Sequence, residues 1–159
     1  MRPSSLCFPT LALASGMLLT APAWAEVKVD GPWVRGTTAS QKTTGAFMTL
    51  ISSGDAALVA ASSPAAGIVE IHEMRMDGSA MRMRHVNELA LPAGKRVDLK
   101  PGGYHIMLRE LRRQMQAGTK VPLLLRIRNR DGTLSEVAVT AEVTSLAGKK
   151  SAPSNHHHH

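Results

Sequence analysis

The chain has 159 residues, which suits a single domain, and its 19 Lys and Arg residues outnumber 12 Asp and Glu to give a formal net charge of +7. Aromatic residues make up only 3% of the chain. Proteins that bind single-stranded nucleic acids stack the bases on aromatic side chains, and this chain has few of them. We therefore expect no nucleic-acid partner. The positive charge is interpreted as a solubilising surface that favours acidic partners.

Residues 1–25 have the pattern of a secretory signal peptide. Arg2 supplies a positive charge, an apolar run follows at 6–20, and the sequence AWA at 23–25 matches an A-x-A cleavage site. The run is interrupted and is shorter than the roughly 18 apolar residues that a membrane anchor requires. We therefore expect cleavage after Ala25, export to the periplasm and no stable insertion into a membrane.

The only cysteine, Cys7, lies in this predicted leader, and residues 3–6 before it do not form the small-residue motif of a lipidation site. Cleavage would leave a cysteine-free mature chain. Such a chain has no disulfides, no thiolate metal ligands and no blue-copper site, which needs a cysteine sulfur. Any metal ligands of the mature chain would therefore be His, Met or carboxylate side chains.

Residues 27–143 are typical of a succession of short strands. Alternating or apolar runs are separated by Gly, Pro, Asp and Ser, although 110–117 could form a helical turn or two before Gly118. This pattern predicts an all-β sandwich or small barrel in a single domain, residues 26–145. The predicted strands are 27–35, 44–52, 57–62, 68–76, 81–87, 96–99, 103–109, 121–129 and 134–143.

The first predicted hairpin joins 68–76 to 81–87. A two-residue loop at Asp77-Gly78 would place His72 directly across from Met83. Because alternate residues of a strand share a face, three side chains of each strand would then project to one side of the hairpin. They are His72, Met74 and Met76 on the first strand, and Met81, Met83 and His85 on the second.

The second predicted hairpin joins 121–129 to 134–143. A two-residue loop would set the apolar residues of one strand against the polar side of the other, because a one-residue slip reverses every side chain. A three-residue loop at 130–132, with Gly132 in the left-handed region, restores the match, and we predict that loop.

Beyond Val143 the sequence becomes polar, and it ends in His156–His159. We expect residues 146–159 to form a flexible tail. The four histidines fit either a trimmed purification tag or a native segment, and a native segment could bind Cu(II) or Zn(II).

His72, Met83, His105 and Met107 follow the spacing H-x10-M-x21-H-x-M. His105 and Met107 are two apart on a predicted strand and share a face, whereas Ile106 should face the core. Two imidazoles and two thioethers form a neutral, soft ligand set that suits monovalent copper better than zinc, calcium or magnesium. The methionines also fit an amphipathic hairpin with a Met-rich buried face, so the pattern alone leaves both interpretations open.

Several segments resemble the periplasmic copper chaperone family PCu(A)C. They cover nearly all of 27–143, and the H-x10-M-x21-H-x-M spacing matches the metal motif of that family, although 109–116 is more basic than expected. The segments are PWVR at 32–35, GAFMTL at 45–50, SSPAA at 62–66, VEIHEM at 69–74, MRMR at 81–84, LPAG at 91–94 and LKPGGYHIML at 99–108.

This resemblance implies a cupredoxin-like, Greek-key β-sandwich that binds Cu(I) through His72, Met83, His105 and Met107. It also implies a metallochaperone that delivers copper to the copper-accepting domain of cytochrome c oxidase, directly or together with Sco-type thiol proteins. We expect the protein to act as a monomer.

Other functions also fit the residues. A copper sequestration or tolerance protein would use the same site together with the histidine tail. A metal-free adhesion or scaffold domain is a further alternative, for which His72→Ala and Met107→Ala would barely affect metal binding. No Ser/His/Asp arrangement, paired-carboxylate motif or phosphate loop is evident in the sequence, so we do not expect an enzyme.

Overall fold

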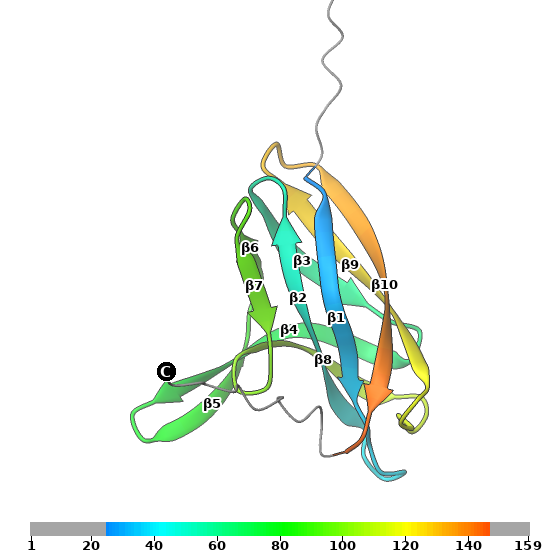
Figure 1. Cartoon of the computed structure of the whole chain (residues 1–159). Coiled ribbons are helices and arrows are strands. Elements are labelled where there is room, and N and C mark those ends of the chain that lie inside the picture. Colours follow the sequence, from blue (N-terminus) through cyan, green and yellow to red (C-terminus); the bar gives the residue numbers. More distant parts are fainter. Residues whose placement is uncertain (1–24, 147–159) are drawn as a thin grey trace, which may run out of the picture.

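The structure, a computed structural model, describes residues 25–146, and within that range it contains ten β-strands and no helix (Figure 1). The strands are β1 (Val27–Arg35), β2 (Thr43–Ser52), β3 (Ala56–Ser62), β4 (Ala66–Asp77), β5 (Ala80–His85), β6 (Leu89–Leu91), β7 (Arg96–Leu99), β8 (Tyr104–Leu111), β9 (Lys120–Asn129) and β10 (Leu134–Thr144).

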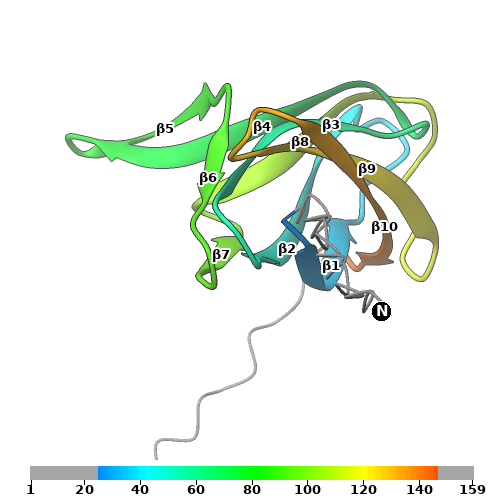
Figure 2. The same cartoon turned by 90° about the horizontal axis from the view of Figure 1, so that it is seen from above.

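All ten strands belong to one hydrogen-bonded sheet. Nine follow the order β5-β4-β8-β2-β1-β10-β9-β3-β6, and β7 pairs with β2. β1 pairs with one edge of β2. The other edge of β2 pairs with β8 along its first part and with β7 along its second part. Seen from above, the sheet curls around its core while the β4–β5 hairpin extends away from it (Figure 2). The predicted all-β fold is therefore confirmed.

The core lies on the inner face of the curled sheet, where burial of apolar side chains supplies the main favourable term in folding. Ile71 of β4 and Ile106 of β8 are register partners on this face and are 3% and 0% exposed. Because neighbouring residues of a strand point to opposite faces, residues 70, 72, 105 and 107 lie on the outer face. On both strands, core residues of the inner face therefore alternate with candidate ligands of the outer face.

The sequence missed one strand and suggested a helical turn that is absent. β6 spans only three residues, with Leu89 and Leu91 buried, and it is too short to show a period. Residues 110–117 contain no helix, because β8 continues to Leu111 and the backbone then bonds to Thr37. The Met115 amide donates to the Thr37 hydroxyl at 3.0 Å, and the Thr37 amide donates to the Met115 carbonyl at 3.0 Å.

The β9–β10 hairpin confirms the predicted three-residue loop. Leu134 pairs with Arg128, and the Asn129 amide donates to the Thr133 carbonyl at 2.8 Å, which leaves 130–132 as the loop. Gly132 has a φ of 84°, in the left-handed region. With this register, apolar residues of β9 pair with apolar residues of β10, as the alternation requires.

Two predicted segments fall outside the described residues. The predicted signal peptide, 1–25, is described only at Ala25, and the predicted tail, 146–159, only at Leu146. Across 25–146, no helix is long and apolar enough to span a membrane.

We predict that Gly132→Ala destabilises the fold through backbone strain. A Cβ at Gly132 meets nothing within 4 Å, so the substitution adds no clash and tests only the positive φ. A left-handed conformation costs an L-residue about 1–2 kcal/mol, and urea denaturation should show a loss of that size. Gly54→Ala is the matched control, since a Cβ there makes only ordinary contact at 3.5 Å. Equal losses in the two variants would contradict the prediction.

Candidate metal centre

The β4–β5 hairpin has a different register from the predicted one. Its loop is Gly78-Ser79, with Asp77 paired to Ala80, so the predicted loop at Asp77-Gly78 is wrong. Gly78 has a φ of 63°, and Ser79 does not have a positive φ. This combination is that of a tight turn with glycine at its first central position, for which Gly-Ser is a known sequence signal.

The shifted loop changes which residues pair across the hairpin, but it does not change the face on which each side chain lies. His72 pairs with His85, Met74 with Met83 and Met76 with Met81, so the prediction that Met83 lies across from His72 is wrong. Both strands keep their alternation, and the six side chains share one side of the hairpin as predicted. Met83 therefore belongs to the next pair on the same face, two residues further toward the hairpin tip than His72.

The neighbouring strand β8 brings the second histidine to the first. His72 and His105 are register partners across β4 and β8, and their ring centroids are 5.9 Å apart. Met107 lies next along β8, paired with Glu70 on one side and with Gly45 of β2 on the other. Ile106 is fully buried, as predicted.

A cavity of about 220 Å³ opens over these strands. Three of the four predicted ligands line it, and His72 adjoins it through its contact with His105. Met74, the register partner of Met83, is a fifth possible ligand at the cavity wall. The lining residues are Arg35, Gly45, Phe47, Met74, Met83, Pro101, Gly102, His105 and Met107.

His105 is the most buried of the candidate ligands. It is 4% exposed, and its Nδ1 lies 3.0 Å from the Gly103 carbonyl oxygen, to which a protonated Nδ1 donates. Burial lowers the pKa of His105 below its usual value, outweighing the hydrogen bond to Gly103. The imidazole is therefore neutral at neutral pH, and its Nε2 carries a lone pair that can bind a metal.

His72 is oriented by a carboxylate that the sequence analysis did not single out. Its Nε2 lies 3.0 Å from Oε2 of Glu70, which also accepts from Arg109 at 3.4 Å. The hydrogen bond from His72 lowers the pKa of Glu70, so the carboxylate is ionised and Nε2 is the donor. Nδ1 of His72 is then left buried with no hydrogen-bond partner. A carboxylate that fixes the tautomer in this way is typical of metal-binding histidines.

Aromatic packing supports the other side of His105. The Phe47 ring lies 6.2 Å from the His105 ring, and Trp33 packs on Phe47 at 4.4 Å. The guanidinium of Arg35 sits 5.6 Å from the centre of the Phe47 ring. A Cβ at Gly45 would lie 2.7 Å from Cζ of Phe47, so only glycine leaves room for this ring.

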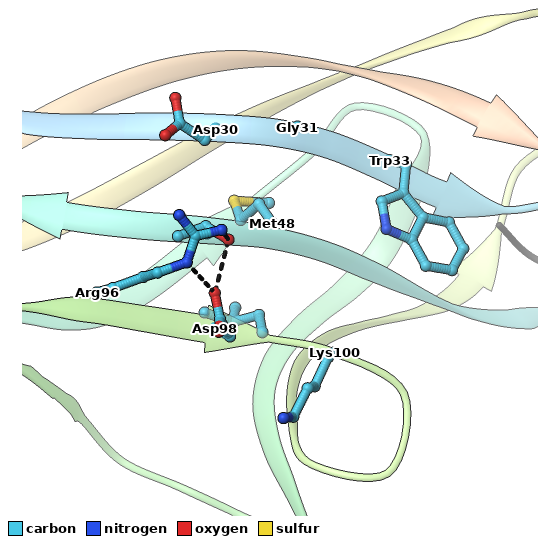
Figure 3. Close-up of a pocket in the computed structure, with 9 residues that line it drawn as sticks. Asp30, Gly31, Trp33, Met48, Arg96, Asp98 and Lys100 are labelled. Carbon is cyan, nitrogen blue, oxygen red and sulfur yellow. Dashed lines mark hydrogen bonds and ion pairs between the residues drawn. The ribbon is translucent and has the colours of Figure 1, made fainter. Parts of the chain in front are cut away.

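A second cavity, of about 290 Å³, lies over β1, β2 and β7 (Figure 3). Asp98 accepts from Arg96 at 3.2 Å and from the hydroxyl of Thr49 at 2.7 Å, and Trp33 lies toward one end. None of the four predicted ligands lines it. Among residues 25–146, no three His, Cys, Asp or Glu side chains are grouped so that they could hold a metal ion.

Sequence comparison places the chain in a family. The family model described as "Putative lipoprotein LpqE-like" matches residues 27–143, so the chain belongs to the LpqE-like family. A relative from Leifsonia xyli subsp. xyli, "Putative lipoprotein Lxx21020", is 36% identical over 126 residues, which cover 77% of this chain and 74% of the relative. A family of lipoproteins is consistent with the predicted export of this chain.

The fold is similar to that of solved PCuAC domains and of DR1885. The copper-bound PCuAC domain from PmoF2 matches with a TM-score of 0.61 and 22% identity, covering 77% of this chain and 96% of that domain. Apo-DR1885 from Deinococcus radiodurans matches with a TM-score of 0.55 and 29% identity, covering 91% and 95%. Its Cu(I) form matches with the same score and identity over 79% and 81%. The expected cupredoxin-like fold is confirmed.

We predict that the metal-free protein loses stability as the pH falls through the range in which unfolded His105 becomes protonated. The folded pKa is lowered, so between that value and about 6.5 the unfolded chain binds more protons and stability rises with pH. One such group contributes at most about 1.4 kcal/mol per pH unit.

Urea midpoints of His105→Gln, measured with a chelator from pH 7 down to pH 5, should show a smaller pH slope than the wild type. His85→Gln is the control, because His85 is exposed on the same face. A slope unchanged in His105→Gln, or reduced equally in both variants, would be inconsistent with this assignment.

Proposed function

We propose that this protein is an exported copper carrier of the PCuAC type, which holds Cu(I) through His72, Met83, His105 and Met107. The observation that carries the proposal is the cross-strand pair of His72 and His105, at a cavity that the two thioethers also line. Copper-bound structures of the PmoF2 domain and of DR1885 share this fold, and the second is 29% identical to this chain.

The donor atoms fit a soft monovalent ion. His72 offers a buried Nδ1 lone pair without a partner, and His105 offers Nε2, because hydrogen bonds occupy the other nitrogen of each ring. Thioethers add soft, uncharged donors, so four such ligands leave the bound Cu(I) with a single positive charge. Cu(II) and Zn(II) would be held less well, because they favour harder or anionic donors.

The thioether side of the site is the adaptable side. Met83 is 47% exposed on β5, a strand exposed at every residue, so few contacts restrain its position. His105, in contrast, is fixed by Phe47 and Gly103. A rigid pair of imidazoles with a mobile thioether suits a carrier, because copper can exchange to a thiolate-rich acceptor one ligand at a time.

We propose that the protein delivers copper to the copper-accepting domain of cytochrome c oxidase, alone or with a Sco-type protein. The net positive charge favours acidic acceptor surfaces. Export to the periplasm after cleavage at Ala25, action as a monomer and the absence of enzymatic activity are further parts of this proposal. The alternative is periplasmic copper sequestration, in which the same site acts with Cu(II) bound at His156–His159.

We predict that His105→Ala abolishes tight Cu(I) binding. Changes near metal ligands typically lower affinity by about 10–100-fold, so loss of a ligand should lower it by more than about 100-fold. Competition with a Cu(I) chelator under anaerobic conditions measures the affinity. The matched control is His85→Ala, which removes an exposed imidazole from the same face and should leave the affinity nearly unchanged. Tight binding retained in His105→Ala would contradict the proposed site.

An experiment with a copper acceptor distinguishes delivery of copper from its storage. Cu(I)-loaded protein, with and without the residues after 145, is mixed with a soluble oxidase copper domain, and the copper content of each is measured after separation. A carrier should metallate the acceptor in both forms. Copper retained by the full-length protein but released from the truncated form would favour sequestration.

A further inference from the structure

The tip of the β4–β5 hairpin lies beyond the rest of the sheet. β8 pairs with β4 only from Ala66 to Glu73, so from Met74 onward the only strand neighbour of β4 is β5. Figures 1 and 2 both show this hairpin extending away from the curled sheet. The methionines near the tip therefore cannot belong to the buried core.

Three methionines of the hairpin are unusually exposed. Met76, Met81 and Met83 are 58%, 53% and 47% exposed, and they share one face. This excludes the interpretation of the hairpin as a Met-rich buried face. Some other requirement must explain why thioethers occupy these positions.

The methionines form a ladder that starts at the metal centre. Met74 and Met83 are register partners at the cavity, and Met76 and Met81 are register partners one step further out. Side chains directly opposite in an antiparallel pair have Cβ atoms about 4.5–5.5 Å apart. The flexible side chains of Met76 and Met81 can therefore turn their sulfur atoms toward a single ion.

Near the tip, from Glu73 to Arg84, the charged side chains of the hairpin lie on its other face. Arg82 pairs with Asp77 at 2.9 Å and Arg84 with Glu73 at 3.2 Å, so these carboxylates are already held by guanidinium groups. Arg75 lies directly opposite Arg82. This cationic surface disfavours hard, hydrated cations, whereas uncharged thioethers still bind soft ones.

We propose that Met76 and Met81 form a second site for a soft monovalent metal ion, Cu(I) or Ag(I), at the tip of the hairpin. Met74, two residues from Met76 on the same face, is the nearest additional thioether along that strand. The tip site binds more weakly than the main centre, because it has no imidazole and its ligands are open to water. An ion there lies on the same face as Met83 and reaches the main centre without crossing the sheet.

The role of this tip site as a waypoint for copper rests on the proposed function, but ion binding at the tip does not. The test uses the whole chain labelled with ¹³C at the methionine methyl groups, titrated with Ag(I) in chloride-free buffer. Each methyl signal reports on its own sulfur. Met48 and Met115, which are 3% and 1% exposed, serve as internal references.

We expect the Met107 signal to shift first and the Met76 and Met81 signals to shift later and saturate. In His105→Ala, which damages the main centre, the Met76 and Met81 shifts should persist. In the double variant Met76→Leu and Met81→Leu, the Met107 shift should be retained, because leucine keeps the size of the side chain and removes only the sulfur.

Two results would overturn the proposal. Met76 and Met81 signals that stay in place under excess Ag(I) would mean that these side chains do not bind soft ions. Shifts that vanish in His105→Ala would mean that they only respond to the main centre. If instead the tip signals shift while Met107 does not, the tip site stands and the proposed function fails.

Discussion

The register between β4 and β8 is the constraint on which the candidate centre depends. It places His72 directly beside His105 on the outer face and sets Ile71 beside Ile106 on the inner face. The two pairs are coupled, because a one-residue slip of β4 would turn Ile71 toward solvent and His72 toward the core. The free energy that holds these two histidines in place therefore comes from apolar burial on the other side of the same strands.

Hydrogen bonds then decide which nitrogen atoms are available. The Gly103 carbonyl accepts a hydrogen bond from one nitrogen of His105. Glu70, which also accepts from Arg109, accepts a hydrogen bond from one nitrogen of His72. Each imidazole then keeps one nitrogen without a hydrogen-bond partner. Met83 is held less tightly, since it lies on the exposed strand β5, whereas Met107 lies on β8 between β4 and β2. The candidate centre thus combines restrained imidazoles with one adaptable thioether.

The sequence predicted the fold well, because strand alternation and turn residues are local signals. It also predicted the β9–β10 loop, since only an odd loop length matches the apolar residues of the two strands. It misplaced the β4–β5 loop by one residue, because Asp77-Gly78 and Gly78-Ser79 are both acceptable turns and both keep the same faces. Face parity alone could not distinguish the partners of Met83.

Other parts of the site depend on contacts between strands distant in sequence. Glu70 shares a face with His72, which was a usable signal, but the alternation does not show which carboxylate will reach an imidazole nitrogen. The packing of Phe47 against His105 requires the β2–β8 register and the space left by Gly45. The exposure of Met76 and Met81 follows from the point at which β8 stops pairing, which lies outside the hairpin itself.

The parallel pairing of β1 with β10 also fixes where the described part of the chain ends. β10 runs beside β1 and pairs Thr144 with Arg35, and the Gly36 amide donates to the Thr144 carbonyl at 2.9 Å. Arg35 itself lines the cavity of the candidate centre. Leu146, the last residue that the structure describes, follows two residues after this pairing. A ligand group attached at this point would act on the cavity at an effective concentration set by the length of its tether and not by the concentration of protein in the compartment.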